Sequence, residues 1–149
     1  MNHFIGTKQV TAQPMTRSDA EARLGRNVGG DKHGDGYLVE YEGGYQAWSP
    51  KDVFDAAYRP TTGMTFGLAI EALKAGKRVA RSGWNGKGMW LFLIQGSNDI
   101  AKLHGYGFGE MMGEPTFRDA IFMKTVDNQL VPWTASQTDC LADDWQIFS

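Results

Sequence analysis

The stretch "MTFGLAIEALKAGKRVARSGWNGKGMWLFLI", residues 64–94, decides the fold, because it carries one helix signal followed by two strand signals. Apolar side chains recur at helical spacing from Phe66 to Leu73. Thr65 is placed to cap the start of this helix, and Gly76 is placed to end it. The pattern therefore predicts one amphipathic helix at the start of this stretch.

Two predicted strands follow the helix. Residues 77–84, "KRVARSGW", and 89–95, "MWLFLIQ", have strand composition, and the second segment is apolar enough to be central in a sheet. Trp90 in that segment is expected to be a core residue. The pair Asn85 and Gly86 favours a tight hairpin turn, because an Asn-Gly pair tolerates the positive φ angles that such a turn needs.

The rest of this half adds more strands. Segments 117–127, "FRDAIFMKTVD", and 130–133, "LVPW", predict a second antiparallel pair. Residues 136–148 predict a short helical turn capped by Ser136 or Thr138, followed by a last strand. The Gly-rich stretch 96–115 predicts a long loop between the two strand pairs.

The first sixty residues contain a sparser set of similar elements. A strand is predicted over 8–16, a helix over 17–25 and a hairpin over 36–49. A second helix is predicted over 49–59, with Ser49 as its N-cap and a proline in the first helical position.

A linker-like stretch rich in Pro, Thr and Gly, "YRPTTGMTF" at 58–66, divides these two halves. We therefore predict a small α+β module over 1–60 and a second domain over 64–149. Runs of strands with few helices indicate an α+β fold, in which an antiparallel β-sheet packs with one or two helices.

Composition is typical of a folded globular protein. The chain has 149 residues, 42% hydrophobic content and a formal net charge of −2, which disfavours a partner such as a DNA or RNA polymer. The apolar runs are shorter than the roughly 20 residues that cross a bilayer, and the first residues lack a secretory pattern. We therefore expect a cytoplasmic protein with no membrane partner. The single Cys140 is expected to be a partly buried structural thiol.

Signals for catalysis are weak. His3, His33 and His104 are isolated in the sequence. The Gly-rich motifs are "GWNGKG" at 83–88 and "GYGFG" at 105–109. Neither motif follows a strand and opens a helix, as a dinucleotide-binding fold requires. We therefore predict no catalytic residue, no metal site and no cofactor, and we expect that the protein is not an enzyme.

The acidic segment "DCLADDW" is compatible with an enzyme as an alternative hypothesis. Asp139, Asp143 and Asp144 could bind a divalent metal and support a phosphodiesterase or nucleotide hydrolase. Carboxylates in such a segment more often cap a helix start or face solvent. Metal-dependent hydrolysis is therefore the alternative hypothesis.

Signals for binding are stronger. Trp84, Asn85 and Gly86 join an aromatic ring, an amide and an accessible backbone, which suits the stacking of a flat base. Arg78 and Arg81 lie nearby in the sequence, and we expect them to pair with a pyrophosphate because they attract anions. The structural alternative is that Trp84 is a core residue beside a hairpin.

A second segment, "PWTASQTD" at 132–139, repeats this combination after Trp133. Its hydroxyl, amide and carboxylate groups could hydrogen-bond a ribose or a base, although a capped helix start is the structural alternative. Together the two segments predict a polar, aromatic-walled pocket. The candidate residues in this segment are Ser136, Gln137, Thr138 and Asp139.

The two segments resemble a known family. "MTFGLAIEALKAGKRVARSGWNGKGMWLFLI" followed by "FMKTVDNQLVPWTASQTDCLADDWQIF" is similar to the Thoeris anti-defence proteins of the second type, from phages and prophages, over residues 64–148. The resemblance implies a non-catalytic sponge that sequesters cyclic ADP-ribose-type immune signals, and in some members cyclic dinucleotides. It also implies a homotetramer with pockets between protomers, in the cytoplasm of the infected bacterial host.

The resemblance also assigns roles within the matching motifs. It implies that Trp84 is the stacking residue, that Asn85 and Gly86 form the pocket edge, and that residues 136–139 hydrogen-bond the ligand. The first sixty residues and the Gly-rich stretch depart from the short members of the family. A third hypothesis is therefore a structural phage module whose N-terminal half docks to another protein.

Overall fold

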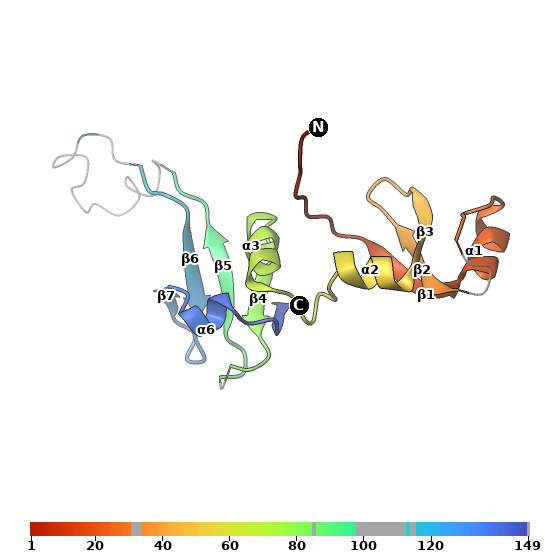
Figure 1. Ribbon diagram of the computed structural model, residues 1–149. Helices are drawn as coiled ribbons and strands as arrows, with labels where there is room; N and C mark the ends of the chain where they lie inside the picture. Colours follow the sequence, from red (N-terminus) through yellow and green to blue (C-terminus); the bar gives the residue numbers. More distant parts are fainter. Residues whose placement is uncertain (31–33, 85, 98–112, 114–115, 149) are drawn as a thin grey trace. The chain divides into compact units, whose positions relative to one another are not determined.

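The chain folds into two compact units, Met1–Arg59 and Pro60–Ser149 (Figure 1). Each unit contains its own antiparallel sheet and short helices, which confirms the predicted α+β fold. The computed structural model describes residues 1–30, 34–84, 86–97, 113 and 116–148.

The N-terminal unit is a three-stranded antiparallel sheet with two short helices packed on it. Its elements are β1 (Thr11–Thr16), α1 (Arg17–Leu24), β2 (Asp35–Glu40), β3 (Gln46–Pro50) and α2 (Lys51–Ala57), with the strands in the order β1-β2-β3. Adjacent residues of a strand point to opposite faces, and both Leu38 and Val39 on the central strand are buried. Both faces of this small sheet are therefore covered.

The start of α2 differs from the prediction. Ser49 was expected as its N-cap, but Pro50 occupies that position and no side chain caps the helix. The reason is that β3 continues through Pro50, since Gly36 on β2 pairs with Pro50. Ser49 therefore remains a strand residue, and it pairs with Tyr37.

The C-terminal unit is a five-stranded antiparallel sheet in the order β7-β6-β5-β4-β8, with two helices. The predicted strand pairs, the helix after Thr65 and the short helix after Ser136 are all confirmed. The elements are α3 (Phe66–Lys74), β4 (Arg78–Arg81), β5 (Trp90–Ile94), β6 (Ala120–Lys124), β7 (Leu130–Pro132), α6 (Gln137–Cys140) and β8 (Trp145–Phe148).

Helix α3 supplies the core of this unit. The Thr65 side chain accepts a hydrogen bond from the backbone N–H of Leu68, and Gly76 follows the helix with a φ of 79°, so both predicted ends are confirmed. Ala69 and Leu73 are fully buried against the sheet, and burial of a side chain the size of Leu73 stabilises the fold by about 1.5–3 kcal/mol. The buried cluster consists of Met64, Ala69, Leu73, Val79, Leu91 and Trp145.

The edge of the sheet at β8 is covered by the residues that precede α3. The backbone N–H of Met64 donates to the carbonyl of Trp145 at 2.7 Å, and the N–H of Trp145 donates back at 3.1 Å. The N–H of Ile147 donates to the carbonyl of Thr61 at 2.9 Å. The linker-like residues therefore belong to the C-terminal unit, where they close an otherwise open strand edge.

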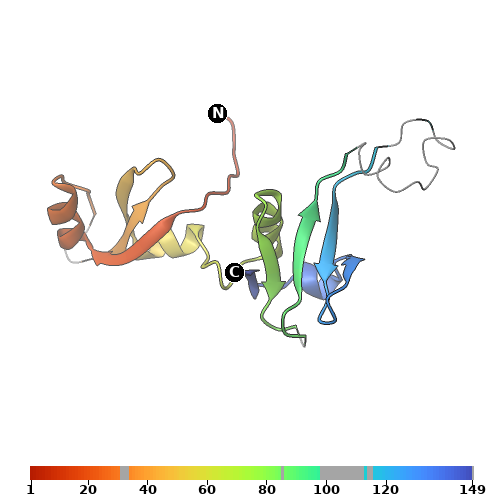
Figure 2. The same cartoon turned by 180° about the vertical axis from the view of Figure 1, so that it is seen from behind.

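The two faces of the five-stranded sheet differ. Val79, Leu91 and Trp145 point to the face on which α3 packs, which we call the helix-covered face. The alternate residues point to the other face, which Figure 2 shows from behind. That face, called here the aromatic face, carries the half-buried rings of Trp90, Phe92, Phe122 and Phe148.

The expectation that Trp90 is a core residue was wrong. Its ring contacts Phe92 edge-on, with centroids 5.4 Å apart, and it is half-buried on the aromatic face. The strand "MWLFLI" looks uniformly apolar, but its alternation sends Leu91 into the core and Trp90 away from it. The buried tryptophan is Trp145 on β8.

Candidate functional site

Trp84 lies at the end of the helix-covered face, within a cluster of tryptophans. Its ring meets the buried Trp145 edge-on with centroids 5.5 Å apart, and it lies 6.3 Å from the ring of Trp133. Trp84 itself is half-buried and packs against the core cluster. Part of the side chain is therefore a core contact, while the rest is accessible to a ligand.

The turn that carries Trp84 joins β4 to β5. The register between β4 and β5 in the described chain is Val79 opposite Leu91, so the turn spans the residues between Arg81 and Trp90. Within this turn Gly88 has a positive φ of 80°. The hairpin is confirmed, and the predicted tight turn depends on Asn85 as well as on Gly86. Asn85 lies outside the described residues.

Gly86 has a packing role in this turn. A Cβ atom added there would lie 2.6 Å from Cε of Met89 and 2.9 Å from Cγ2 of Val126. Real Cβ atoms essentially never approach so closely. Gly86 therefore lets the turn lie directly on these two side chains.

Arg81 connects three parts of the C-terminal unit. Its Nη1 donates to Oδ1 of Asp139 at 2.9 Å, and its Nε donates to Oδ1 of Asp144 at 2.8 Å. The Arg81 and Asp139 side chains are only 17% and 14% exposed, so water screens their ion pair less than it screens a surface pair. A hydrogen bond between charged groups contributes about 1.5–3 kcal/mol.

The Asp144 carboxylate also holds the turn next to Trp84. Its Oδ2 accepts from the backbone N–H of Gly83 at 2.8 Å and from the hydroxyl of Ser82 at 3.3 Å. The Asp144 carbonyl accepts from the backbone N–H of Ser82 at 3.1 Å. A Cβ atom on Gly83 would lie 2.8 Å from Oδ2, so glycine permits this close approach.

The segment after Trp133 folds as a capped helix start. Ser136 and Asp139 form a capping box, in which each side chain hydrogen-bonds the other residue's backbone N–H, both at 3.1 Å. The carbonyl of Asp139 accepts from the indole N–H of Trp145 at 3.0 Å, and its Oδ1 lies 3.5 Å from Nε1 of Trp84. The structural alternative weighed for this segment is therefore observed.

The pKa values of both carboxylates are lowered. The Arg81 guanidinium lowers the pKa of Asp144 below its ordinary value of 3.8, against the opposing effect of burial. Burial raises the pKa of Asp139, but hydrogen bonds from Ser136 and Arg81 outweigh it and the net shift is downward. The two carboxylates in turn raise the pKa of Arg81.

The structure brings some predicted residues together and separates others. Trp84, Arg81, Ser136 and Asp139 meet in one cluster. Gln137 and Thr138 are exposed on α6 beside it. Arg78 lies on the aromatic face instead, with its guanidinium 5.2 Å from the ring centre of Trp90, so in one chain it does not face Trp84.

Sequence reasoning missed the role of Asp144, which it considered as a metal ligand or as a carboxylate that caps a helix or faces solvent. Asp144 and Arg81 are 63 positions apart, and they meet because β4 and β8 are neighbours in the sheet. The same pairing places Arg81 opposite Trp145. This contact could be predicted from the sequence only if the order of the strands in the sheet were known.

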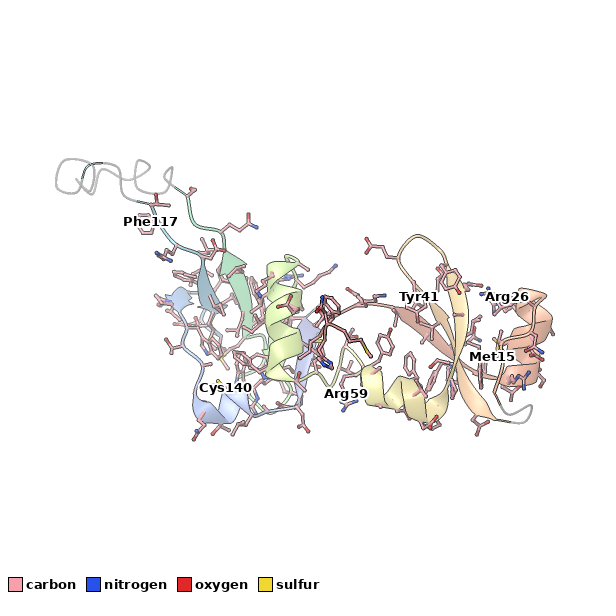
Figure 3. The ribbon with its side chains drawn as sticks, turned by 45° about the horizontal axis from the view of Figure 1, so that its top comes forward. Met15, Arg26, Tyr41, Arg59, Phe117 and Cys140 are labelled. Carbon is pink, nitrogen blue, oxygen red and sulfur yellow. The ribbon has the colours of Figure 1, made fainter. Side chains whose placement is uncertain are left out.

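Other predicted features can be placed as well. Across the described ranges, no group of three or more His, Cys, Asp or Glu side chains is arranged to hold a metal ion, and no helix is long and apolar enough to cross a membrane. His33 and His104 lie outside those ranges. Cys140 is exposed on α6 (Figure 3), so the expectation of a partly buried thiol was wrong.

Comparison with known proteins identifies similarity in the C-terminal unit. A family model of the Thoeris anti-defense 2-like domain matches residues 64–148. The protein "Thoeris anti-defense 2" of Bacillus phage SP01 is 54% identical over 88 residues, which is 59% of this chain and 98% of that relative. The family match covers the unit that contains the Trp84 cluster and leaves the N-terminal unit unmatched.

Proposed function

The chain belongs to the Thoeris anti-defense 2-like family, which supports a phage anti-defense role, and we propose that it acts as a molecular sponge. In this proposal the C-terminal unit binds a cyclic ADP-ribose isomer, or a related cyclic dinucleotide, and sequesters it without cleavage. The removal of this immune signal blocks a Thoeris-like defence in the cytoplasm of the infected bacterial host.

The observation that carries the proposal is the half-buried Trp84 beside the polar start of α6. A base that stacks on an aromatic ring contributes about 1–3 kcal/mol. Trp84 is held edge-on by Trp145, and exposed Gln137 and Thr138 follow Ser136 on the adjacent helix. An immobilised ring next to hydroxyl and amide groups suits a nucleoside, which offers a flat base and a hydroxylated ribose.

The proposal changes which basic side chain pairs with the phosphate groups of the ligand. Arg81 was expected to bind a pyrophosphate, but its guanidinium already donates to Asp139 and Asp144. Lys87 is exposed on the same turn as Trp84, so we propose it as the phosphate partner. Arg81 then acts within the protein rather than on the ligand.

The same contacts favour binding over hydrolysis. The alternative hypothesis requires Asp139, Asp143 or Asp144 to hold a divalent metal. Arg81 already pairs with two of these carboxylates, with hydrogen bonds of 2.9 Å to Asp139 and 2.8 Å to Asp144, and a metal ion would have to displace it. We therefore favour a protein that is not an enzyme.

We also propose that the protein is a homotetramer. The aromatic face supports this, because an antiparallel sheet usually presents polar side chains on a face that stays in contact with water. Here four aromatic rings occupy that face, and Arg78 lies over two of them, Trp90 and Phe148. A symmetric contact between copies would cover these rings.

The test is recovery of the ligand after binding. The full chain is incubated with a cyclic ADP-ribose isomer produced by a TIR-domain enzyme, separated from free ligand and heated. A sponge releases the intact isomer, and a useful one binds it with a Kd of roughly 1 nM, about −12 kcal/mol. Recovery of a hydrolysed product would contradict the proposal, and so would the absence of binding to every cyclic nucleotide in a thermal-shift screen.

A further inference from the structure

The start of the turn that carries Trp84 is held by hydrogen bonds to Asp144, the residue that immediately precedes β8. Strand β4 is aligned with β8 over four residue pairs, but with β5 only at Val79 and Leu91. Three consecutive residues at the start of the turn, Arg81, Ser82 and Gly83, all donate hydrogen bonds to Asp144. One carboxylate therefore gathers the backbone that leads directly into Trp84.

We infer that Asp144 is a positioning residue, which fixes Trp84 for ligand binding and is itself oriented by Arg81. This inference rests on the proposed function, since it assigns how that binding site is held. Asp144 acts through the backbone: its Oδ2 fixes the N–H of Gly83, and the next residue is Trp84. The Asp144 side chain is 27% exposed and is not a member of the buried apolar cluster.

The Arg81 guanidinium sets the geometry of this support. Its Nε occupies Oδ1 of Asp144, which leaves Oδ2 directed at the turn. Its Nη1 reaches Asp139 on α6, the residue that lies beside the Trp84 indole. A single guanidinium thus links the turn to α6, so that the ring of Trp84 and the polar groups of α6 keep a constant separation.

A double-mutant cycle tests whether Asp144 acts through Trp84. In the full chain, Asp144→Asn removes the negative charge and places an amide near the Arg81 donor. We expect a loss of affinity for the cyclic ADP-ribose isomer of about tenfold. In a Trp84→Ala background the same substitution should change the affinity less than about twofold, because the ring to be positioned is absent.

A matched control separates positioning from a general loss of stability. Glu71→Gln breaks an exposed ion pair with Lys74 on α3, in the same unit but away from the turn. It should leave the affinity unchanged in both backgrounds. Gly83→Ala should reproduce the effect of Asp144→Asn, because its Cβ would push against Oδ2.

A spectroscopic readout needs no ligand. With 5-fluorotryptophan incorporated, the ¹⁹F signal of Trp84 should shift and broaden in Asp144→Asn, while that of Trp48 in the N-terminal unit should stay in place. Failure of the wild-type protein to bind any cyclic nucleotide would refute the proposed function, yet the ¹⁹F experiment would still decide the positioning role. An unchanged Trp84 signal, or equal affinity losses in both backgrounds, would overturn the inference.

Discussion

Replacement of Trp84 by alanine should cost both stability and affinity, in amounts that the structure sets. Trp84 contacts Trp145 at 5.5 Å and Trp133 at 6.3 Å, and each aromatic pair contributes about 0.5–1.5 kcal/mol beyond burial. A fully buried tryptophan would cost about 3–5 kcal/mol on truncation, but Trp84 is only half-buried. We therefore expect Trp84→Ala to destabilise the unit by about 2 kcal/mol.

This estimate revises the view of Trp84 as a pure stacking residue, for which the melting temperature would hardly change. A loss of about 2 kcal/mol corresponds to a fall in melting temperature of roughly 8–16 °C for a domain of this size. The mutant should still be folded at low temperature. There its affinity for the cyclic nucleotide should fall by the stacking contribution, about 1–3 kcal/mol, which is roughly 5- to 150-fold.

The assay is calorimetric titration at 10 °C together with thermal unfolding of the free protein. Trp84→Phe retains a ring, so it should recover most of the affinity lost in the alanine variant. Leu73→Ala provides the opposite control: Leu73 on α3 is almost fully buried, so this change should lower stability and leave affinity nearly intact in the folded protein. A folded Trp84→Ala protein with wild-type affinity would refute the assignment of the site.

Three further predictions concern other parts of the unit. Phe92→Glu, on the aromatic face, should convert the proposed tetramer into 16.5 kDa monomers in light scattering, whereas Val53→Glu on the exposed surface of the N-terminal unit should not. Lys87→Ala should lower ligand affinity by about tenfold in titrations, while Arg78→Ala in the monomeric Phe92→Glu protein should have no effect on it. Because the pKa of Asp144 is lowered below 3.8, its stabilising effect is complete at neutral pH and is lost as the pH falls through the folded value. The melting temperatures of wild type and Asp144→Asn should therefore differ at neutral pH and converge as the pH falls below the folded-state pKa of Asp144, which lies below 3.8.

Local signals in the sequence were sufficient for most of the fold. The helix after Thr65 was predictable because its cap, its apolar spacing and its terminating glycine all lie within twelve residues. The capped start of α6 was predictable for the same reason. The N-cap of α2 was not, because the pairing of Pro50 with Gly36 on a distant strand decides where that helix begins.

The site was less predictable, because strand order determines it. Trp84 and Asp139 were predicted as site residues from two local segments, whereas Arg81, which hydrogen-bonds Asp139, was assigned to a phosphate. The two aspartates that it contacts follow it by 58 and 63 positions, and only the pairing of β4 with β8 brings them within 3 Å. Arg78 does not lie beside Arg81 as expected for a shared pyrophosphate site, because residues three apart on a strand point to opposite faces.

In the proposed binding mode, the charges around Trp84 decide which part of the nucleotide lies against this cluster. Arg81 carries one positive charge, and Asp139 and Asp144 have lowered pKa values, so the three groups leave a net charge of −1 at neutral pH. A phosphate group would be repelled from this side of the ring, whereas the hydroxyl donors of a ribose would not. The base should therefore stack on Trp84 with its ribose toward α6 and its phosphates toward the exposed Lys87. In this orientation the carboxylates that argue against a pyrophosphate at Arg81 would favour the nucleoside end of the proposed ligand.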